Sequence, residues 1–218
     1  MDNSGSMQAF DGKMWLPKQA SRAFGVGSSQ TFAKVQCSRW DELKQSLLWH
    51  GEVAAQLGCR TEFHLLNPPQ GGAPQRVVVG APGEVPGTNT ATNYEPASLQ
   101  ALRQACESRP LMKTPLCEAV RKILADLQVV GPALKAAGKT ACIIVASDGE
   151  SSDGDVARAL APLQGLPCSS QVVVRLCTDD EKVATRRTGQ GGCLLVRRHR
   201  PSFFCESDCA HRAEKGLC

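Results

Sequence analysis

The chain has 218 residues, enough for one domain with a short appendage, and its 42% apolar and 21% charged residues exclude a disordered protein. No apolar run approaches the roughly 20 residues that a membrane-spanning helix needs. The N-terminus, Met-Asp-Asn-Ser-Gly-Ser-Met, has neither the basic flank nor the apolar stretch of a signal peptide. We therefore expect a cytoplasmic protein, with the nucleus as the alternative compartment, that does not act at a membrane.

Charge and cysteine content separate residues 1–181 from residues 182–218. The first stretch holds 17 Lys/Arg and 18 Asp/Glu, a formal net charge of −1, whereas the second holds 8 and 3, a net charge of +5. The second stretch also carries four of the eleven cysteines. We expect a folded domain over 1–181 with reduced, partly buried thiols, followed by a basic, Cys-rich, disordered tail over 182–218. The net charge of residues 1–181 gives no support for nucleic-acid binding, and the basic charge of residues 182–218 gives only weak support.

The first half predicts alternating elements with long irregular stretches. Residues 8–38 are mixed and predict mostly loop. A helix follows, capped by Asp41 and ended by Gly58, because apolar residues recur between them at steps of three and four. The remaining predicted elements of this half are strands over 61–66 and 76–79, a Pro- and Gly-rich loop over 81–96, and a helix over 97–107.

The second half of the sequence predicts a clearer alternation of helices and strands. Thr114-Pro115 is typical of a helix start, and Gly131-Pro132 is expected to break that helix. Residues 140–146 form an apolar run that predicts a buried parallel strand. Asp155 is expected to cap a short helix, and 171–176 predicts the next strand. This order indicates an α/β, Rossmann-like fold: an open, mostly parallel central sheet with helices on both faces.

The N-terminus places oxygen-bearing side chains at alternate positions. Asp2, Ser4 and Ser6 supply one carboxylate and two hydroxyls, with Gly5 between the hydroxyls. A loop of this composition can turn hard oxygens toward one point, and hard oxygens favour Mg²⁺, Mn²⁺ or Ca²⁺ over zinc or copper. Alone, the pattern also describes an ordinary polar turn.

Two further segments strengthen the metal interpretation. Asp148 follows the predicted strand over 140–146, and Thr114 precedes a predicted helix. In an open parallel sheet, ligands bind at the carboxyl ends of the strands, so three loops at this edge can deliver two carboxylates and three hydroxyls to one cation. Such a metal remains underneutralised and can accept an acidic group from a partner.

This arrangement resembles the von Willebrand factor type A domain and its metal-ion-dependent adhesion site. The family pattern is Asp-x-Ser-x-Ser, a later Thr, and then Asp-Gly after a core strand; Asp2, Ser4, Ser6, Thr114 and Asp148 match it in order over about residues 1–178. The resemblance implies that Ser4, Ser6 and Thr114 contact Mg²⁺ directly and that Asp2 and Asp148 act largely through coordinated water. It also implies that a partner's Asp or Glu completes the coordination.

The threonine has an alternative. Thr92 lies in a stretch, Thr-Asn-Tyr-Glu, that is also similar to the family's threonine loop. Thr114 precedes Asp148 by 34 residues, enough for one helix, a loop and a strand, whereas Thr92 would require an additional helix. We therefore assign Thr114.

Both ends of the chain depart from the family pattern. The family places an apolar strand before the motif aspartate, in the middle of the sheet, and this chain has only Met1 there. We expect the first strand to be missing and the domain to be poorly stable for that reason, because about five buried side chains at ~1.5–3 kcal/mol each would be lost. At the other end, the tail abandons the α/β pattern where a last helix and strand should come. Both ends are therefore expected to be those of an incomplete or altered translation product.

The sequence thus predicts a divalent-cation-dependent protein-binding module without catalysis. One alternative is a metal-assisted hydrolase that uses Ser4 or Ser6 as nucleophile, which needs a nearby general base; no histidine accompanies the three loops in the sequence. The other alternative is a scaffold whose metal site stays empty because the N-terminus cannot fold it.

Overall fold

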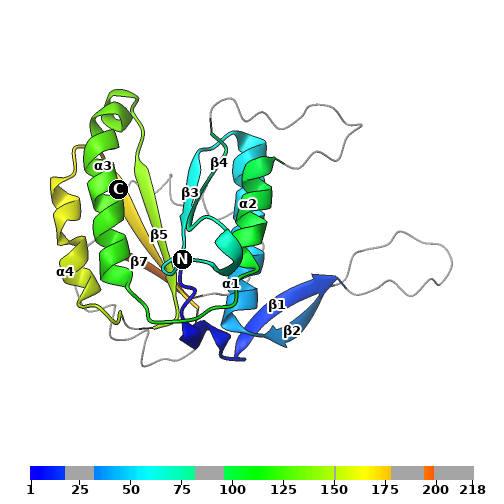
Figure 1. Cartoon of the computed structure of the whole chain (residues 1–218). Coiled ribbons are helices and arrows are strands. Elements are labelled where there is room, and N and C mark those ends of the chain that lie inside the picture. The colour runs from blue at the N-terminus through cyan, green and yellow to red at the C-terminus, as the bar shows by residue number, and fades with distance from the viewer. Residues whose placement is uncertain (18–31, 82–95, 150, 178–193, 199–218) are drawn as a thin grey trace, which may run out of the picture.

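A computed structural model describes residues 1–17, 32–81, 96–149, 151–177 and 194–198 (Figure 1). The α-helices of this part of the chain are α1 (Arg39–Leu57), α2 (Ala97–Cys106), α3 (Leu116–Ala136) and α4 (Val156–Leu160). Its strands are β1 (Gly12–Pro17), β2 (Phe32–Cys37), β3 (Thr61–His64), β4 (Arg76–Val79), β5 (Ala141–Ser147), β6 (Ser170–Leu176) and β7 (Leu194–Arg198). Short 3-10 turns are η1 (Gly5–Gln8), η2 (Gln70–Gly72) and η3 (Ala161–Gly165).

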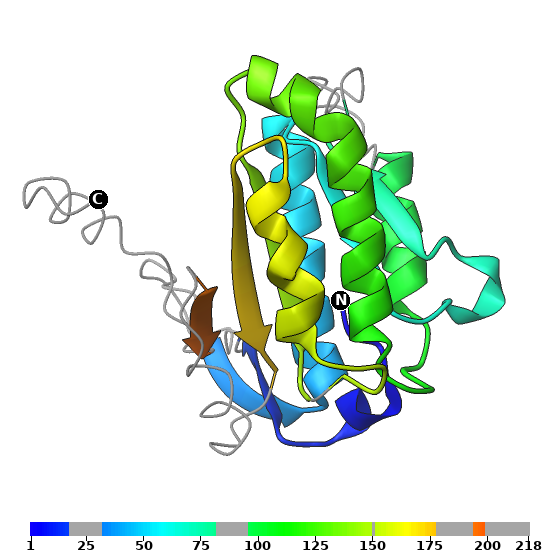
Figure 2. The ribbon, with the colours of Figure 1, turned by 90° about the vertical axis from the view of Figure 1, so that its left-hand side faces the viewer.

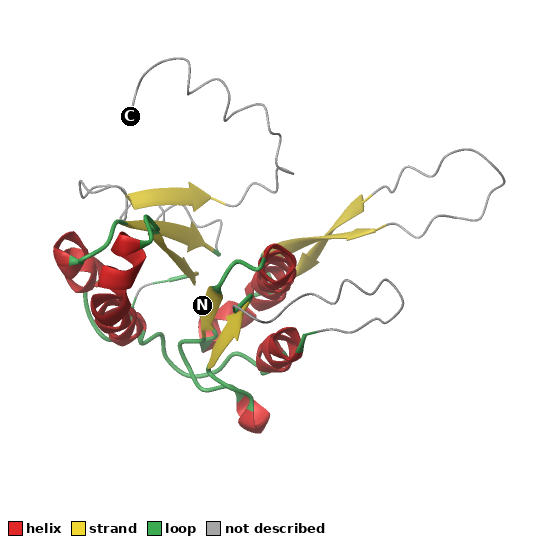
Figure 3. Ribbon diagram, turned by 90° about the horizontal axis from the view of Figure 1, so that it is seen from above, coloured by secondary structure: helices red, strands yellow, loops and turns green. Residues whose placement is uncertain are grey.

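The second half of the chain forms a small parallel sheet. Strand β5 pairs with β6 along its whole length, from Ala141 opposite Ser170 to Ser147 opposite Leu176, and β7 pairs with the other edge of β6. Helices α3 and α4 lie side by side along β5 and β6 (Figures 2 and 3), and their apolar faces form one buried cluster with these two strands. The predicted parallel pair is therefore confirmed.

The first half builds a second unit. Strands β3 and β4 form an antiparallel pair, and α1 and α2 pack on it through a second buried cluster. Helix α1 ends as predicted at Gly58, which adopts the left-handed conformation (φ 60°) that glycine accepts without strain. Its N-terminal cap is Ser38 rather than Asp41: the Ser38 hydroxyl oxygen accepts a hydrogen bond from the Asp41 N–H.

The segment predicted as loop over residues 8–38 contains an antiparallel hairpin. Strands β1 and β2 pair from Gly12 opposite Cys37 to Pro17 opposite Phe32, and β1 packs against α1. The sequence gives no sign of them because most side chains of these strands are at least partly exposed, so the apolar alternation that marks a half-buried strand is absent.

The single open sheet that we expected is not seen among the described residues. Their strands form three short sheets, β1–β2, β3–β4 and β5–β6–β7. Strands β3 and β5 do not pair with each other; the N-terminus lies between them (Figure 1), where Met1 hydrogen-bonds to His64 and Leu66 and Asp2 hydrogen-bonds to Ala146. The described part of the chain is thus a mixed α/β fold with short sheets.

Helix α3 begins differently from the sequence prediction. Thr114 does not cap it with its side chain; the carboxylate of Asp153 accepts hydrogen bonds from the N–H groups of Cys117 and Glu118, at 3.0 and 2.8 Å. Burial alone would raise the pKa of Asp153, but hydrogen bonds from Ser151 and from these two N–H groups hold it below its ordinary value.

The predicted break at Gly131-Pro132 is wrong, since α3 continues to Ala136. Gly131 lacks the Cβ that would crowd the ring of the following proline, and Pro132 removes only one intrahelical hydrogen bond near the helix end. Gly131 is buried, and a Cβ there would lie 2.5 Å from Pro167 Cγ. Close packing therefore explains both the glycine and the unbroken helix.

None of the helices in the described ranges is long and apolar enough to cross a membrane. Strand β7 lies within the stretch predicted as a disordered tail; the remainder of residues 182–218 is outside the described residues, and so is most of the predicted loop over 81–96. The division at residue 181 stays a prediction.

We predict that Asp153→Ala lowers the free energy of unfolding by about 1 kcal/mol, since it removes both cap bonds of the 21-residue helix α3. Asp153→Asn should keep most of the stability, because the amide oxygen still accepts. The matched control is Asp155→Ala, which removes a single cap bond from the five-residue helix α4. Urea unfolding of the three variants checks this order, and an equal or larger loss for Asp155→Ala would contradict it.

Candidate functional site

Three loops meet at the carboxyl end of β5, and main-chain hydrogen bonds tie them together. The N-terminal loop is joined to the loop before α3, and that loop is joined to the loop after β5. The bonds are Leu111 N–H to Asn3 O (3.0 Å), Gly5 N–H to Met112 O (3.1 Å) and Ser152 N–H to Thr114 O (2.9 Å). The structure therefore brings together the three segments that the sequence analysis assigned to one site.

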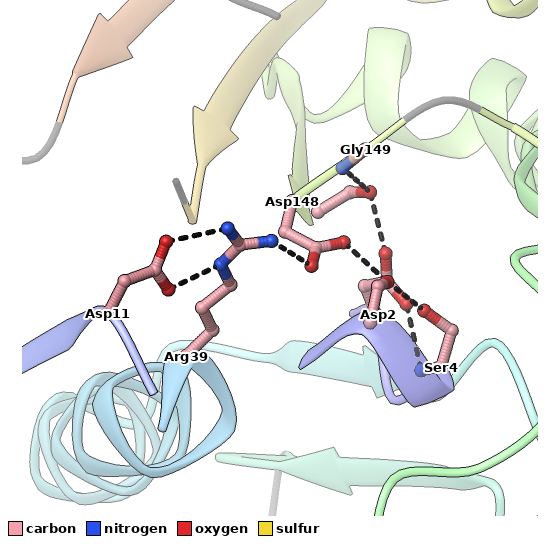
Figure 4. A network of polar contacts seen from close by, with 8 residues as sticks. Asp2, Ser4, Asp11, Arg39, Asp148 and Gly149 are labelled. Atoms are coloured by element: carbon pink, nitrogen blue, oxygen red, sulfur yellow. Dashed lines mark hydrogen bonds and ion pairs between the residues drawn. The ribbon is translucent and has the colours of Figure 1, made fainter. Parts of the chain in front are cut away.

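Asp2 is the most enclosed member of the site. Its side chain is fully buried, one carboxylate oxygen accepts from the Ser4 N–H at 2.9 Å, and the other accepts from the Ser147 hydroxyl at 2.6 Å. The Asp2 N–H donates to Ala146 O at 2.9 Å. Asp2 thus fixes the N-terminal loop against the end of β5, because its carboxylate holds both Ser4 and Ser147 (Figure 4).

Ser4, Ser6 and Asp148 form a continuous chain of oxygens. The two hydroxyl oxygens lie 3.0 Å apart, and the Ser6 hydroxyl donates to Asp148 Oδ1 at 2.9 Å. Ser4 and Asp148 are buried, whereas Ser6 is exposed. Three of the five proposed ligands therefore lie in direct contact, with Ser6 at the open side.

The spacing of these oxygens fits a small divalent cation. The 2.9 and 3.0 Å separations along the Ser4–Ser6–Asp148 chain are ordinary O–H···O hydrogen-bond distances. Adjacent ligands of an octahedral ion with bonds of roughly 2.0–2.1 Å lie about equally far apart, so the same oxygens are compatible with such an ion. Among the described residues no group of three or more His, Cys, Asp and Glu could hold a metal ion. A cation here would therefore depend on hydroxyl oxygens.

Arg39 is a member of the site that the sequence analysis missed. Its guanidinium Nη1 donates to Asp148 Oδ2 at 2.7 Å, and Nε and Nη2 make a two-pronged contact with Asp11, both at 2.6 Å (Figure 4). The hydrogen bonds to Asp11, together with the bond to Asp148, raise the pKa of Arg39 and keep it charged, although burial opposes them. No spacing rule links the first residue of α1 to a loop 109 positions later.

The Asp148 carboxylate is shared between two partners. One oxygen of that carboxylate faces Ser6 and the other faces Arg39. The Asp148 side chain is 1% exposed, so its charge requires a positive partner, and Arg39 supplies one. Asp2 carries a second buried carboxylate, and Arg39 does not contact it in any described bond. The charge of Asp2 instead acts on the amino group of Met1, since it opposes the lowering of the pKa of that group by burial.

Thr114 joins the site through its main chain. Its carbonyl accepts from Ser152 N–H and from Leu116 N–H, and the residue is buried. The oxygen chain of Ser4, Ser6 and Asp148 forms without it. The alternative, Thr92, lies outside the described residues. The assignment of Thr114 as a direct ligand stays a prediction.

A pair of buried asparagines fixes the geometry of the loops. Asn3 and Asn67 exchange two hydrogen bonds, from Asn3 Nδ2 to Asn67 O (2.9 Å) and from Asn67 N–H to Asn3 Oδ1 (2.8 Å). The side-chain amide of Asn67 then donates to the carbonyls of Leu111 and Lys113. The segment after β3 is thereby linked to both the N-terminal loop and the loop that carries Thr114.

Exposed apolar side chains border the site. Phe10, Leu111 and Met112 belong to, or directly follow, segments that form it, and they are 66%, 39% and 73% exposed. Met112 also has a φ of 71°, a left-handed conformation that costs a non-glycine residue about 1–2 kcal/mol. The Gly5 N–H donates to the main-chain oxygen of this residue at 3.1 Å.

No family model, curated protein or solved structure matches the chain. The interpretation of the site therefore depends on its own geometry. That geometry offers the two serines no histidine among the described bonds: His64, on β3, hydrogen-bonds with Glu62, and His50, on α1, with Ser46 O. Ser4 and Ser6 instead contact each other and Asp148.

We predict that Asn67→Asp destabilises the protein more than Asn67→Ala. Alanine leaves the carbonyls of Leu111 and Lys113 without their donor, at a cost of about 1–3 kcal/mol. Aspartate has the same shape but turns acceptors toward those carbonyls, which adds repulsion. Chemical denaturation gives the free energies of unfolding.

The control for this pair is Gln56→Glu, which makes the same amide-to-carboxylate change at an exposed position of α1. It should lower the free energy of unfolding by less than about 1 kcal/mol, because its only cost is a negative charge in the last turn of α1, four residues after Glu52. Equal stability of Asn67→Asp and the wild type would contradict the role assigned to the two asparagines.

Proposed function

We propose that the chain is a divalent-cation-dependent protein-binding module in which Asp2, Ser4, Ser6, Thr114 and Asp148 hold Mg²⁺, or Mn²⁺ or Ca²⁺ in its place. The observation that carries the proposal is the meeting of the Ser4, Ser6 and Asp148 oxygens, from two separate loops, at the carboxyl end of β5. Ser4 and Ser6 would bind the ion directly, and Asp2, enclosed by Ser4 N–H and Ser147, would hold the loop and contribute charge.

The donor set favours a binding role over a catalytic one. Hydroxyls are neutral ligands, so they add no negative charge beyond that of the two carboxylates, and Arg39 already compensates one of these. The ion would therefore keep net positive charge and attract a carboxylate from a partner, which is the acidic group of an Asp or Glu side chain. The exposed apolar residues Phe10, Leu111 and Met112 provide contact area around that single charged interaction.

The arrangement of the strands supports the same proposal. We infer an open central sheet with helices on both faces, similar to that of the von Willebrand factor type A domain. In this sheet, β3–β4 and β5–β6–β7 would be the two halves, and the first strand would be missing between them. Supporting this inference, the main chain of Met1 and Asp2 hydrogen-bonds to both halves, and the candidate ligands follow the carboxyl end of β5.

We also infer a reducing, cytoplasmic compartment. The seven cysteines within the described ranges are free, and five of them are buried. Burial raises the pKa of Cys106 to about 11 and that of Cys177 to about 12, so these thiols stay protonated and unreactive.

We predict that Mg²⁺ raises the stability of the folded chain by about 1.4 kcal/mol at tenfold its dissociation constant, because the site forms only in the folded state. Thermal unfolding in EDTA and in millimolar Mg²⁺ measures the gain. Asp148→Ala should abolish it. Asp153→Asn is the matched control, since it changes a carboxylate that caps α3 and lies outside the ligand set. Identical midpoints with EDTA and Mg²⁺ in the wild type would remove the basis of the proposal.

Acetate can represent the carboxylate of the partner. If acetate completes the coordination of the ion, saturating acetate must tighten Mg²⁺ binding, and EDTA must abolish acetate binding, because coupling between two ligands is reciprocal. Isothermal titration with each ligand in turn measures both effects. Mg²⁺ binding that is insensitive to acetate would leave a structural metal site and contradict the partner-binding function.

Arg39 makes a separate prediction about affinity. Arg39→Gln removes the positive charge that now neutralises one oxygen of Asp148, so that oxygen becomes available to Mg²⁺. We therefore expect roughly tenfold tighter Mg²⁺ binding, equivalent to about 1.4 kcal/mol. Arg39→Lys is the control that keeps the charge but loses the two-pronged contact with Asp11. Isothermal titration compares the three proteins. Weaker Mg²⁺ binding in Arg39→Gln than in Arg39→Lys would show that Arg39 assists the ion rather than competing with it.

A further inference from the structure

A cavity of about 410 Å³ lies between helices α3 and α4, which lie side by side (Figure 2). This α3–α4 hollow is lined by one residue of α3 and by residues of α4 and the two positions before it: Arg121, Gly154, Asp155, Arg158 and Ala159. Small-molecule sites in proteins typically have volumes of roughly 300–1,000 Å³. The hollow therefore has room for a small ligand or for one group of a larger one.

The two arginines of the hollow differ from the other arginines whose side chains the structure describes. Neither the Arg121 nor the Arg158 guanidinium makes a hydrogen bond or an ion pair with a residue in the described ranges. Each of the others contacts an acidic or amide side chain; they are Arg39, Arg60, Arg76, Arg103, Arg109 and Arg175. The two guanidiniums without a partner in this part of the chain thus line the same cavity.

The carboxylates near the two arginines bond to other groups. One oxygen of Asp155 accepts a hydrogen bond from the Ala157 N–H at 2.9 Å and caps α4. Glu118, one turn before Arg121, forms an ion pair with Lys122 at 2.7 Å. The lining itself carries the two positive charges of the arginines and the single negative charge of Asp155. Positive charge is therefore in excess at the hollow, and an anion is the ligand that it favours.

Two guanidiniums at one cavity favour a phosphate group over a carboxylate. Each guanidinium presents its N–H groups as a planar fork that can pair with two oxygens of one anion. A phosphate monoester has three terminal oxygens and a charge of about −1.5 to −2 at pH 7, so it can pair with both forks and neutralise both charges. A carboxylate has two oxygens and a single charge, which leaves one guanidinium without compensation.

We propose that the α3–α4 hollow binds a phosphate monoester through Arg121 and Arg158, and that the charge of Asp155 opposes this binding. The phosphate group belongs either to a phosphorylated side chain of another protein or to a small phosphorylated molecule, since the two arginines would recognise the phosphate itself. The hollow is separate from the proposed metal site, because its lining shares no residue with the proposed ligands Asp2, Ser4, Ser6, Thr114 and Asp148.

The first test is a titration of the full chain with inorganic phosphate, in EDTA and at constant ionic strength, followed by NMR. We expect the Nε–H signals of Arg121 and Arg158 to shift and to saturate. Acetate should bind about tenfold more weakly, because it offers each fork fewer charged oxygens. Unchanged signals in tens of millimolar phosphate would overturn the proposal, and so would equal affinities for acetate and phosphate.

Arginine variants locate the site. Arg121→Gln and Arg158→Gln should each weaken phosphate binding roughly tenfold, because each removes one charged fork, and both side chains are exposed, so the variants should fold. Arg60→Gln is the matched control, since it removes an exposed arginine that does not line the hollow. It should leave the affinity unchanged. An equal loss of affinity in Arg60→Gln would show a response to net charge alone and would overturn the proposal.

Asp155 gives a test in the opposite direction. Asp155→Asn removes the negative charge from the lining, while its amide oxygen can still accept the hydrogen bond from the Ala157 N–H. We therefore expect phosphate to bind several-fold more tightly to Asp155→Asn than to the wild type. An unchanged or weaker affinity would contradict the placement of the anion beside Asp155.

Two monoesters distinguish the sources of the phosphate group. In the same titration, tighter binding of N-acetyl-phosphoserine amide than of glycerol phosphate would assign the site to a phosphorylated protein, and the reverse order would assign it to a small molecule. Weaker binding of both monoesters than of inorganic phosphate would contradict a monoester site. Phosphate binding should survive Asp148→Ala, whereas the response to Mg²⁺ should not, so this proposal and the proposed function can fail separately.

Discussion

The arrangement of the molecule depends on three main-chain hydrogen bonds made by its first two residues. Met1 bonds twice to the end of β3, and Asp2 bonds once to the end of β5. No strand pairing among the described residues joins the β3–β4 unit to the β5–β6–β7 unit. Because the three bonds lie at the carboxyl ends of both strands, they hold that edge together and leave the opposite ends of β3 and β5 unpaired with each other. The buried apolar clusters also cross this line, since Ala146 and Cys177 belong to the cluster of α1 and α2, and Leu66 belongs to the cluster of α3 and α4.

The same two residues position the candidate metal site. Asp2 holds the N-terminal loop through three hydrogen bonds. Its carboxylate accepts from the Ser4 N–H and the Ser147 hydroxyl, and its own N–H donates to Ala146 O of β5. The loop then places Ser4 and Ser6 beside Asp148. Structural support and ligand geometry are thus not separable here. A change that loosened Asp2 would disturb both the joint between the halves and the row of oxygens.

Arg39 adds a competing element to that site. A buried carboxylate such as Asp148 needs a positive partner, and in this structure the guanidinium supplies it from the start of α1. A divalent ion would offer the same neutralisation from the Ser6 side. The two-pronged contact of Arg39 with Asp11 gives the guanidinium a second partner, so it can lose its bond to Asp148 without losing its charge compensation. If the proposed ion binds, its competition with Arg39 would therefore depend on Asp11 as well as on the proposed ligands.

The sequence by itself determined the elements that depend on local chemistry, and only the tertiary structure decided which distant groups would meet. Apolar periodicity predicted α1 and the parallel strands β5 and β6, and the spacing of the N-terminal oxygens and Asp148 placed the site at the carboxyl edge of β5. By contrast, Asp153 rather than Thr114 caps α3, and Arg39 reaches Asp148 across 109 positions. No local pattern signals these pairs, because each depends on how separate elements pack. The continuation of α3 through its Gly-Pro pair has the same cause, since burial of the glycine against a distant proline outweighs the local preference to end a helix.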